Sequence, residues 1–278
     1  MTLTNRVAGF VLALSVTGVS AAFAQSELVD LLQRHGIQLK DGAFDAAFDA
    51  YAAPTVPVTP GSFAAPLAIL TTSTGGEQVA GAYAFGILAG RSGRAASPQE
   101  LAAAGQSLTA MIGSSDRRTR IAGARVAGRV FAAPYDRSGV RPAVPPGLTD
   151  ALFALLNHDP EIDQLAAMDA LGLLRERSAV SALTERYYFY REGNKRGLAG
   201  GALEALARIG DASTVALVKQ VAADRWAEGK DATALAVAFA RERMLKDGSI
   251  AAIQQAVDDK SRRNQARGYL AELGAPVP

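Results

Sequence analysis

A ten-residue pattern of small and apolar positions recurs four times along this 278-residue chain. Its copies begin at Val79, Ile121, Leu165 and Gly200, so successive copies start 42, 44 and 35 residues apart. Within each copy the apolar residues recur with the spacing of one helix face. Repeats of this length predict two-helix units that stack into a solenoid, an architecture that often serves as a binding surface.

The third and fourth copies agree over two helices rather than one. At an offset of 35 residues, five apolar positions of one unit fall on apolar positions of the next: Met168 on Leu203, Leu171 on Leu206, Leu174 on Ile209, Val180 on Val215 and Leu183 on Val218. A Gly210-Asp211 turn separates the two helices of the fourth unit. The sequence therefore predicts an all-α array of about five such units.

The best-formed unit resembles the HEAT-repeat family, in its short variety named after phycobiliprotein lyases. The residues that carry the resemblance are the run ALEALARIGD at 202–211, followed by Val215, Leu217 and Asp224. The resemblance covers roughly residues 75–275 and implies a right-handed α-solenoid of two-helix repeats, with the Ala/Leu helix inside and the second helix on the concave side. A proline-rich insert at 134–147, a missing Gly-Asp turn in the second unit and a degraded fifth unit near 232–257 depart from that pattern. Residues 263–274 again look like the first helix of a repeat, with Arg267 giving the polarity expected of a terminal cap.

Glycines recur at matched positions of the repeated helices, namely at 81, 86, 123, 128 and 172. Each one weakens a helix by about 1 kcal/mol relative to alanine. We expect them to let neighbouring helices approach closely. A phosphate-binding role is the alternative, but no Gly-Lys-Ser/Thr run follows Gly75-Gly76, which favours a helix entry there.

Helix starts are also marked in the sequence. Ser97-Pro98-Gln99-Glu100 has the form of a capping box, with proline in the first turn. Asp116 or a neighbour is expected to cap the next helix. Asp159-Pro160 predicts an N-cap followed by proline at the first helical position.

The first 24 residues have the features of a secretory signal peptide. Arg6 gives a positive start, residues 7–19 form an apolar stretch, and Ala22-Phe23-Ala24 fits the small-x-small cleavage rule. An uncleaved anchor is the alternative. The expected organisation is a signal peptide at 1–24, a short helical segment and proline-rich strap at 25–70 with the strap at 54–66, and the repeat domain at 71–278.

The composition and charge of the chain argue against several kinds of binding site. The formal net charge of +2, from 29 basic and 27 acidic residues, gives no electrostatic basis for nucleic-acid binding. With no cysteine there is no lipoprotein anchor, disulfide or thiolate metal site. The two histidines, His35 and His158, lack metal-ligand spacing, so no metal or other cofactor is expected. We expect a periplasmic or secreted protein with no membrane span in the mature chain.

Four consecutive aromatic residues, Tyr187-Tyr188-Phe189-Tyr190, precede Arg191 on a predicted second helix. At 100° per residue, about two of the four rings should be buried and two exposed. Exposed tyrosine beside arginine is typical of interface hot spots, which makes this segment the candidate protein-binding site, with Tyr187, Tyr188, Tyr190 and Arg191 as its residues. The alternative is that the rings only fill a gap in the core.

No catalytic motif accompanies these features: there is no nucleophile elbow, and the acidic pairs lie in polar turns. The sequence therefore predicts a non-catalytic scaffold or adaptor that binds a protein or peptide of unknown identity. Two alternatives stay open, an enzyme or lyase-like accessory subunit with a site in a groove, and a structural protein of the cell envelope. The oligomeric state is not predicted.

Overall fold

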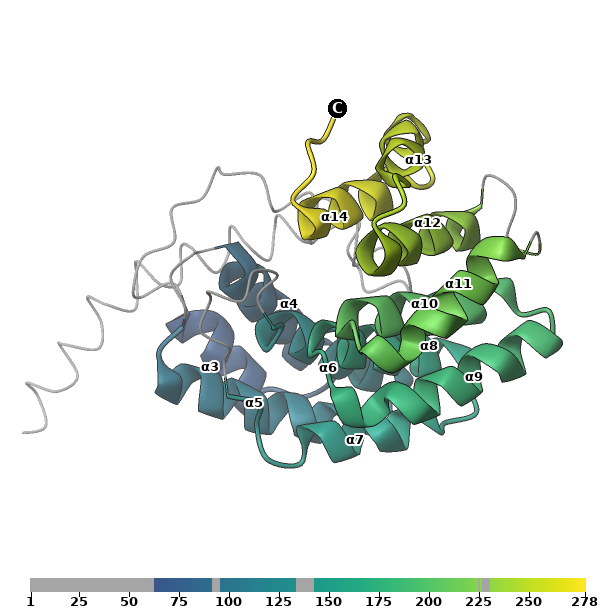
Figure 1. The fold of residues 1–278 in the computed structure, drawn as a ribbon. Helices are drawn as coiled ribbons and strands as arrows, with labels where there is room; N and C mark the ends of the chain where they lie inside the picture. The colour runs from purple at the N-terminus through teal and green to yellow at the C-terminus, as the bar shows by residue number, and fades with distance from the viewer. Residues whose placement is uncertain (1–62, 92–95, 134–142, 225, 227–230) are drawn as a thin grey trace, which may run out of the picture. The chain divides into compact units, whose positions relative to one another are not determined.

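The computed structural model describes residues 63–91, 96–133, 143–224, 226 and 231–278 (Figure 1). The predicted signal peptide, most of the strap, His35 and residues 134–142 of the insert lie outside the described residues. Within these ranges the chain is all-helical, without strands. The α-helices are α3 (Ala64–Thr72), α4 (Gly75–Arg91), α5 (Pro98–Ile112), α6 (Arg117–Val130), α7 (Leu148–Leu156), α8 (Glu161–Leu173), α9 (Val180–Glu192), α10 (Arg196–Ile209), α11 (Val215–Ala223), α12 (Ala232–Leu245), α13 (Ile250–Gln255) and α14 (Arg263–Leu273).

The chain divides within α5 into two compact units, one ending at Ser107 and one beginning at Leu108. In the first unit α3 packs against α4. The Phe63 and Phe85 rings meet edge to face with centroids 5.5 Å apart. The end of the predicted extended strap is instead helical, because α3 begins at Ala64. Pro66 is tolerated there since the first turn of a helix needs no amide donor at that position.

The second unit consists of two rows of helices. The first helices of the repeats form one row, in which α6 packs on α8, α8 on α10, and α10 on α12. The second helices are α7, α9 and α11, which pack on α8, α10 and α12 respectively. Figure 1 shows α7, α9 and α11 along one side of this unit. The packing is consistent with a helical repeat array.

The predicted 35-residue register is present in the backbone. Helices α9 and α11 begin at Val180 and Val215, each preceded by a short 3-10 turn: Arg177–Ala179 before α9 and Ala212–Thr214 before α11. The carboxylates of Glu176 and Asp211 cap these turns by accepting hydrogen bonds from the serine amide two residues later, at 3.2 and 3.0 Å. Gly210 has the left-handed φ of 69° that its turn requires, and Arg175 adopts a φ of 49° at the matching position.

The expected caps are confirmed at two helices and wrong at a third. The Ser97 Oγ accepts from the Glu100 amide, and the Glu100 carboxylate accepts from the Ser97 amide at 2.7 Å. Asp116 accepts from the amide of Thr119 at 2.8 Å, at the start of α6. Helix α8, however, begins at Glu161 with Pro160 as its N-cap and no side-chain cap. Asp159 therefore lies one position too early to cap it.

Glycines bring the first helices into backbone contact, as the sequence predicts. A Cβ atom added to Gly128 would lie 2.7 Å from the Cα of Ala170, and one added to Gly172 would lie 2.7 Å from the Cα of Ala205. In both cases the eighth position of one repeat meets the sixth position of the next. A Cβ atom added to Gly81 would lie 2.7 Å from the amide nitrogen of Leu70, and one added to Gly123 would lie 3.0 Å from that of Ile112. These contacts also favour packing over phosphate binding at these positions.

The repeated contact gives a matched pair of variants. Gly172→Ala is expected to destabilise the protein by about 1–3 kcal/mol, because the new methyl group meets a backbone atom that cannot rotate away. Gly200→Ala is expected to be neutral or to stabilise by up to about 1 kcal/mol, since its nearest neighbour would lie 3.5 Å away and alanine favours the helix. Urea unfolding of both variants measures the difference. Equal effects would contradict the close-packing role.

Candidate functional site

The aromatic segment of α9 has two buried and two exposed rings, as its helical spacing predicts. Tyr187 and Tyr190 are fully buried, whereas Tyr188 is 37% and Phe189 58% exposed. Leu183, Tyr187 and Tyr190 follow one another at four and three residues, so they share the face of α9 that points to the core. The burial pattern was therefore readable from the position of Leu183.

This distribution changes the set of candidate contact residues. Tyr187 and Tyr190 are held inside the protein and cannot touch a partner directly, while Phe189, which the sequence-based set omits, is the most exposed of the four rings. Burial raises the pKa of both inner phenols above the usual value of 10. They act as anchors for the two outer rings.

The exposed rings continue onto α11 and the following turn. The Tyr188 hydroxyl donates to Gln220 Oε1 at 3.2 Å. Arg191 forms a hydrogen-bonded ion pair with Asp224, and its guanidinium lies 5.8 Å from the ring centroid of Trp226.

Arg196, the first residue of α10, lies 5.6 Å from the Trp226 centroid, and the indole nitrogen donates to Asn194 at 3.4 Å. Trp226 thus makes cation–π contacts with two arginines, each worth about 0.5–1 kcal/mol at an exposed site. We call the outer residues of this region the α9–α11 surface: Tyr188, Phe189, Arg191, Gln220 and Trp226.

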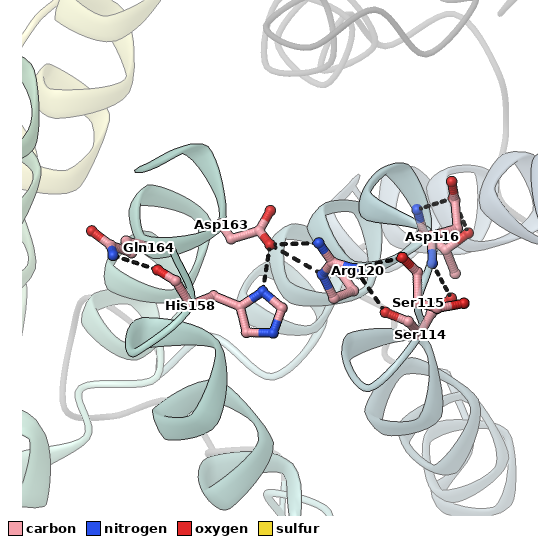
Figure 2. Close-up of polar contacts among 8 residues, drawn as sticks. Ser114, Ser115, Asp116, Arg120, His158, Asp163 and Gln164 are labelled. Carbon is pink, nitrogen blue, oxygen red and sulfur yellow. Dashed lines mark hydrogen bonds and ion pairs between the residues drawn. The ribbon is translucent and has the colours of Figure 1, made fainter. Parts of the chain in front are cut away.

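A network of buried polar side chains joins α9 to α8. The Tyr190 hydroxyl donates to Gln164 of α8, and the Gln164 amide donates to the carbonyl oxygen of His158. Asp163, fully buried on the same helix turn, accepts from Arg120 Nε at 3.0 Å and Nη2 at 2.8 Å, both through Oδ2. The Nδ1 atom of His158 lies 3.0 Å from the same oxygen (Figure 2).

Arg120 also ties the start of α6 to the loop before it. Its Nη1 donates to the carbonyl oxygens of Ser114 and Ser115 at 3.0 and 2.8 Å (Figure 2). The His158–Asp163 pair has the outline of a base with its orienting carboxylate, and the His158 side chain is 46% exposed. However, the guanidinium already neutralises the oxygen that faces His158. This arrangement favours a structural tie over acid–base chemistry.

Arg120 and His158 can be separated by mutation. Arg120→Ala is expected to destabilise the protein by about 3–5 kcal/mol, because it leaves the Asp163 carboxylate buried without its cation. His158→Ala removes a half-exposed partner and is expected to cost less than about 1 kcal/mol. Denaturant unfolding near neutral pH measures both, and a larger loss in the histidine variant would contradict the assignment.

A second charged cluster lies on the first helices. Arg208 of α10 pairs with Asp169 of α8 at 2.6 Å and with Glu204, one turn back, at 2.6 Å. Its Nε and Nη2 also hold both carboxylate oxygens of Glu272 in α14 at 3.0–3.2 Å. The side chains of Arg208 and Glu272 are only 7% and 4% exposed. Three carboxylates from three helices therefore converge on one cation.

Residues of this cluster occupy equivalent positions in successive copies of the repeat. Arg125, Asp169 and Glu204 are the fifth residues of successive copies of the ten-residue pattern, and Arg129 and Arg208 are ninth residues. We call these five residues the charged stripe. The recurrence of polar residues at the fifth position was a signal in the sequence, but the convergence on Arg208 was missed because Glu272 comes from a helix 64 residues later.

The pKa values of the two carboxyl groups of the stripe, Glu204 and Asp169, are shifted in opposite directions. Burial raises the pKa of Glu204, and the nearby charge of Asp169 adds to this against the opposing effect of Arg208. For Asp169 burial acts in the same direction, but the charges of Arg208, Arg129 and Arg125 outweigh it and lower the pKa.

These opposite shifts predict opposite pH dependences. Because the folded pKa of Glu204 is raised, its contribution to stability is present at low pH and is lost as the pH rises through that pKa. Glu204→Gln should therefore gain stability relative to wild type as the pH increases. For Asp169, whose folded pKa is lowered, the contribution is present above about pH 4 and lost on acidification, so Asp169→Asn should lose stability relative to wild type near neutrality. Urea midpoints between about pH 2 and pH 8 test both, and parallel curves for the two variants would contradict the shifts.

Within the described ranges, no group of three or more His, Asp or Glu side chains is arranged to hold a metal ion. None of the helices that the structure describes has the length and apolar character to cross a membrane.

No known protein family, curated protein or solved structure matches this chain. The resemblance to HEAT repeats therefore rests on the residues of the repeated units. The helix packing of the second unit is consistent with such an array but does not establish its family or handedness.

Proposed function

We propose that this chain is an exported, non-catalytic protein-interaction scaffold, built as a right-handed HEAT-like solenoid and working in the periplasm or outside the cell. The observation that carries the proposal is the α9–α11 surface. In the described part of the chain, the large apolar side chains that face solvent are Tyr188, Phe189 and Val277, and Val277 is next to the C-terminus. Two adjacent exposed rings in mid-array are therefore unusual for this protein.

The chemistry of this surface supports a protein or peptide partner. Aromatic rings bury a large apolar area at low entropic cost, and tyrosine, tryptophan and arginine are the residue types most enriched in interface hot spots. The rings are also pre-positioned, since the neighbouring Tyr187 and Tyr190 are fixed in the core and Tyr188 is hydrogen-bonded to Gln220. A pre-organised surface loses little conformational freedom on binding.

The test is a crosslinked pull-down of the protein from its own cell envelope. Tyr188→Ala combined with Phe189→Ala is expected to reduce partner capture by about tenfold or more, the effect of removing a hot spot. Ser181→Ala, an exposed change two turns earlier on α9, is the control and should leave capture unchanged. Because Trp226 is the only tryptophan, an unaltered fluorescence spectrum shows that the surface has kept its structure.

Undiminished capture by the double variant, with normal folding, would refute this surface as the binding site. The intact mass of the recovered protein also tests export, since a chain that starts at Gln25 is expected after signal-peptide cleavage.

A further inference from the structure

Basic side chains beside the exposed rings of the α9–α11 surface already have acidic partners on the protein. The ion pairs are Arg191–Asp224, Lys195–Glu161 and Arg196–Asp231. A charged partner would have to compete with these pairs for the same side chains, whereas a neutral partner leaves them intact. The chemistry of the surface therefore favours an uncharged ligand that packs on aromatic rings.

Hydrogen-bond donors accompany the rings of this surface. The Gln220 oxygen accepts from the Tyr188 hydroxyl, and the amide NH2 of Gln220 carries two donor hydrogens. The indole nitrogen of Trp226 is a further donor, at 3.4 Å from its acceptor on Asn194. Aromatic rings combined with donors suit a polyproline II segment, since the backbone carbonyls of such a segment have no partners within their own helix.

The chain itself contains a segment with this chemistry in the strap. Pro54, Pro57 and Pro60 recur every three residues, and no charged residue occurs between Ala50 and Gly76. A polyproline II helix has three residues per turn, so three prolines with this spacing share one edge of it. Residues 54–60 are therefore a neutral ligand of the kind that the surface favours.

This proline segment lies outside the described residues, and it is joined to the protein at its C-terminal end. Only two residues separate Pro60 from Phe63, which is 3% exposed and whose ring packs edge to face on Phe85. Each copy of the chain thus carries the ligand next to its first unit and the aromatic surface on its second unit.

From these features we infer that residues 54–60 of one copy bind to the α9–α11 surface of a second copy. The inference rests on the proposed function, because it names the partner of the same surface. Tyr188 and Phe189 are exposed in the single chain, so this position is open to a segment of another molecule. Since the ligand and the surface are different parts of the chain, the contact is heterologous and generates rings or filaments of copies.

The first experiment measures self-association of the full mature chain by sedimentation velocity at increasing concentration. Two variants are compared with wild type: a strap variant with Pro54, Pro57 and Pro60 changed to serine, and a surface variant with Tyr188→Ala and Phe189→Ala. Each variant alone is expected to associate at least about tenfold more weakly than wild type. An equimolar mixture of the two is expected to form one-to-one pairs, because one keeps the surface and the other keeps the strap.

The matched control changes Thr55 and Thr59 to serine, which leaves the proline spacing intact, and should associate as wild type does. A wild-type chain that stays monomeric at every concentration would overturn the inference, as would variants that do not pair when mixed. If the surface variant fails to fold, Phe189→Ala alone replaces it, since this ring is 58% exposed and outside the core.

The second experiment titrates a peptide of residues 50–62 into the strap variant and follows the fluorescence of Trp226, the only tryptophan of the chain. A peptide of the same composition without the three-residue proline spacing is expected to bind at least about tenfold more weakly. Equal binding of the two peptides would overturn the inference. So would tight binding of the first peptide by a strap variant whose wild type is monomeric, because each strap would then occupy its own chain.

Failure of this inference can be told apart from failure of the proposed function. Capture of another protein that requires Tyr188 and Phe189, yet is not reduced by the peptide, would refute the strap as the ligand and leave the surface as a binding site. Undiminished capture by the surface variant, together with unchanged self-association, would refute the surface itself.

Discussion

Backbone contact between first helices is the constraint on which the second unit depends. At Gly128 and Gly172 there is room for a hydrogen atom and nothing larger, because the neighbouring alanine Cα would lie 2.7 Å from an added Cβ. This contact sets the distance between successive first helices. With so little side-chain volume inside the row, the large apolar residues must pack elsewhere, and many of them, such as Leu206 and Tyr190, fill the core.

The residues of the charged stripe lie along this row of first helices. Where two helices nearly touch, side chains at the flanks of the contact are held close to those of the next helix. That proximity allows Arg208 to reach Asp169 across the α8–α10 contact, and the same geometry places Arg125 and Arg129 near Asp169. Burial disfavours these charges individually, so they persist only as an interlocked set.

The parts of this arrangement that have a local cause could be predicted from the sequence. Helical periodicity placed the repeats, the serine and aspartate caps marked starts of α5 and α6, and Leu183 indicated which tyrosines would be buried. Of the two exceptions, one has a local cause and the other a tertiary one. Helix α8 begins one residue later than predicted, because Pro160 occupies its N-cap position. The position of α14 depends on Arg208, which is distant from it in the chain. The convergence of the stripe on Arg208 does not follow from local periodicity, because Glu272 lies 64 residues away.

The capped 3-10 turns before α9 and α11 have a consequence for how the chain folds. Each turn is closed by residues two positions apart, so its closing hydrogen bond is local in the chain. Each of the two adjacent units therefore has a local feature that marks the start of its second helix. Short-range contacts of this kind favour fast folding. The Arg208–Glu272 pair closes a loop of 64 residues and carries a larger entropic penalty. Docking of α14 thus depends on a contact more distant in the chain than the one that joins Arg208 to Asp169 of the neighbouring first helix.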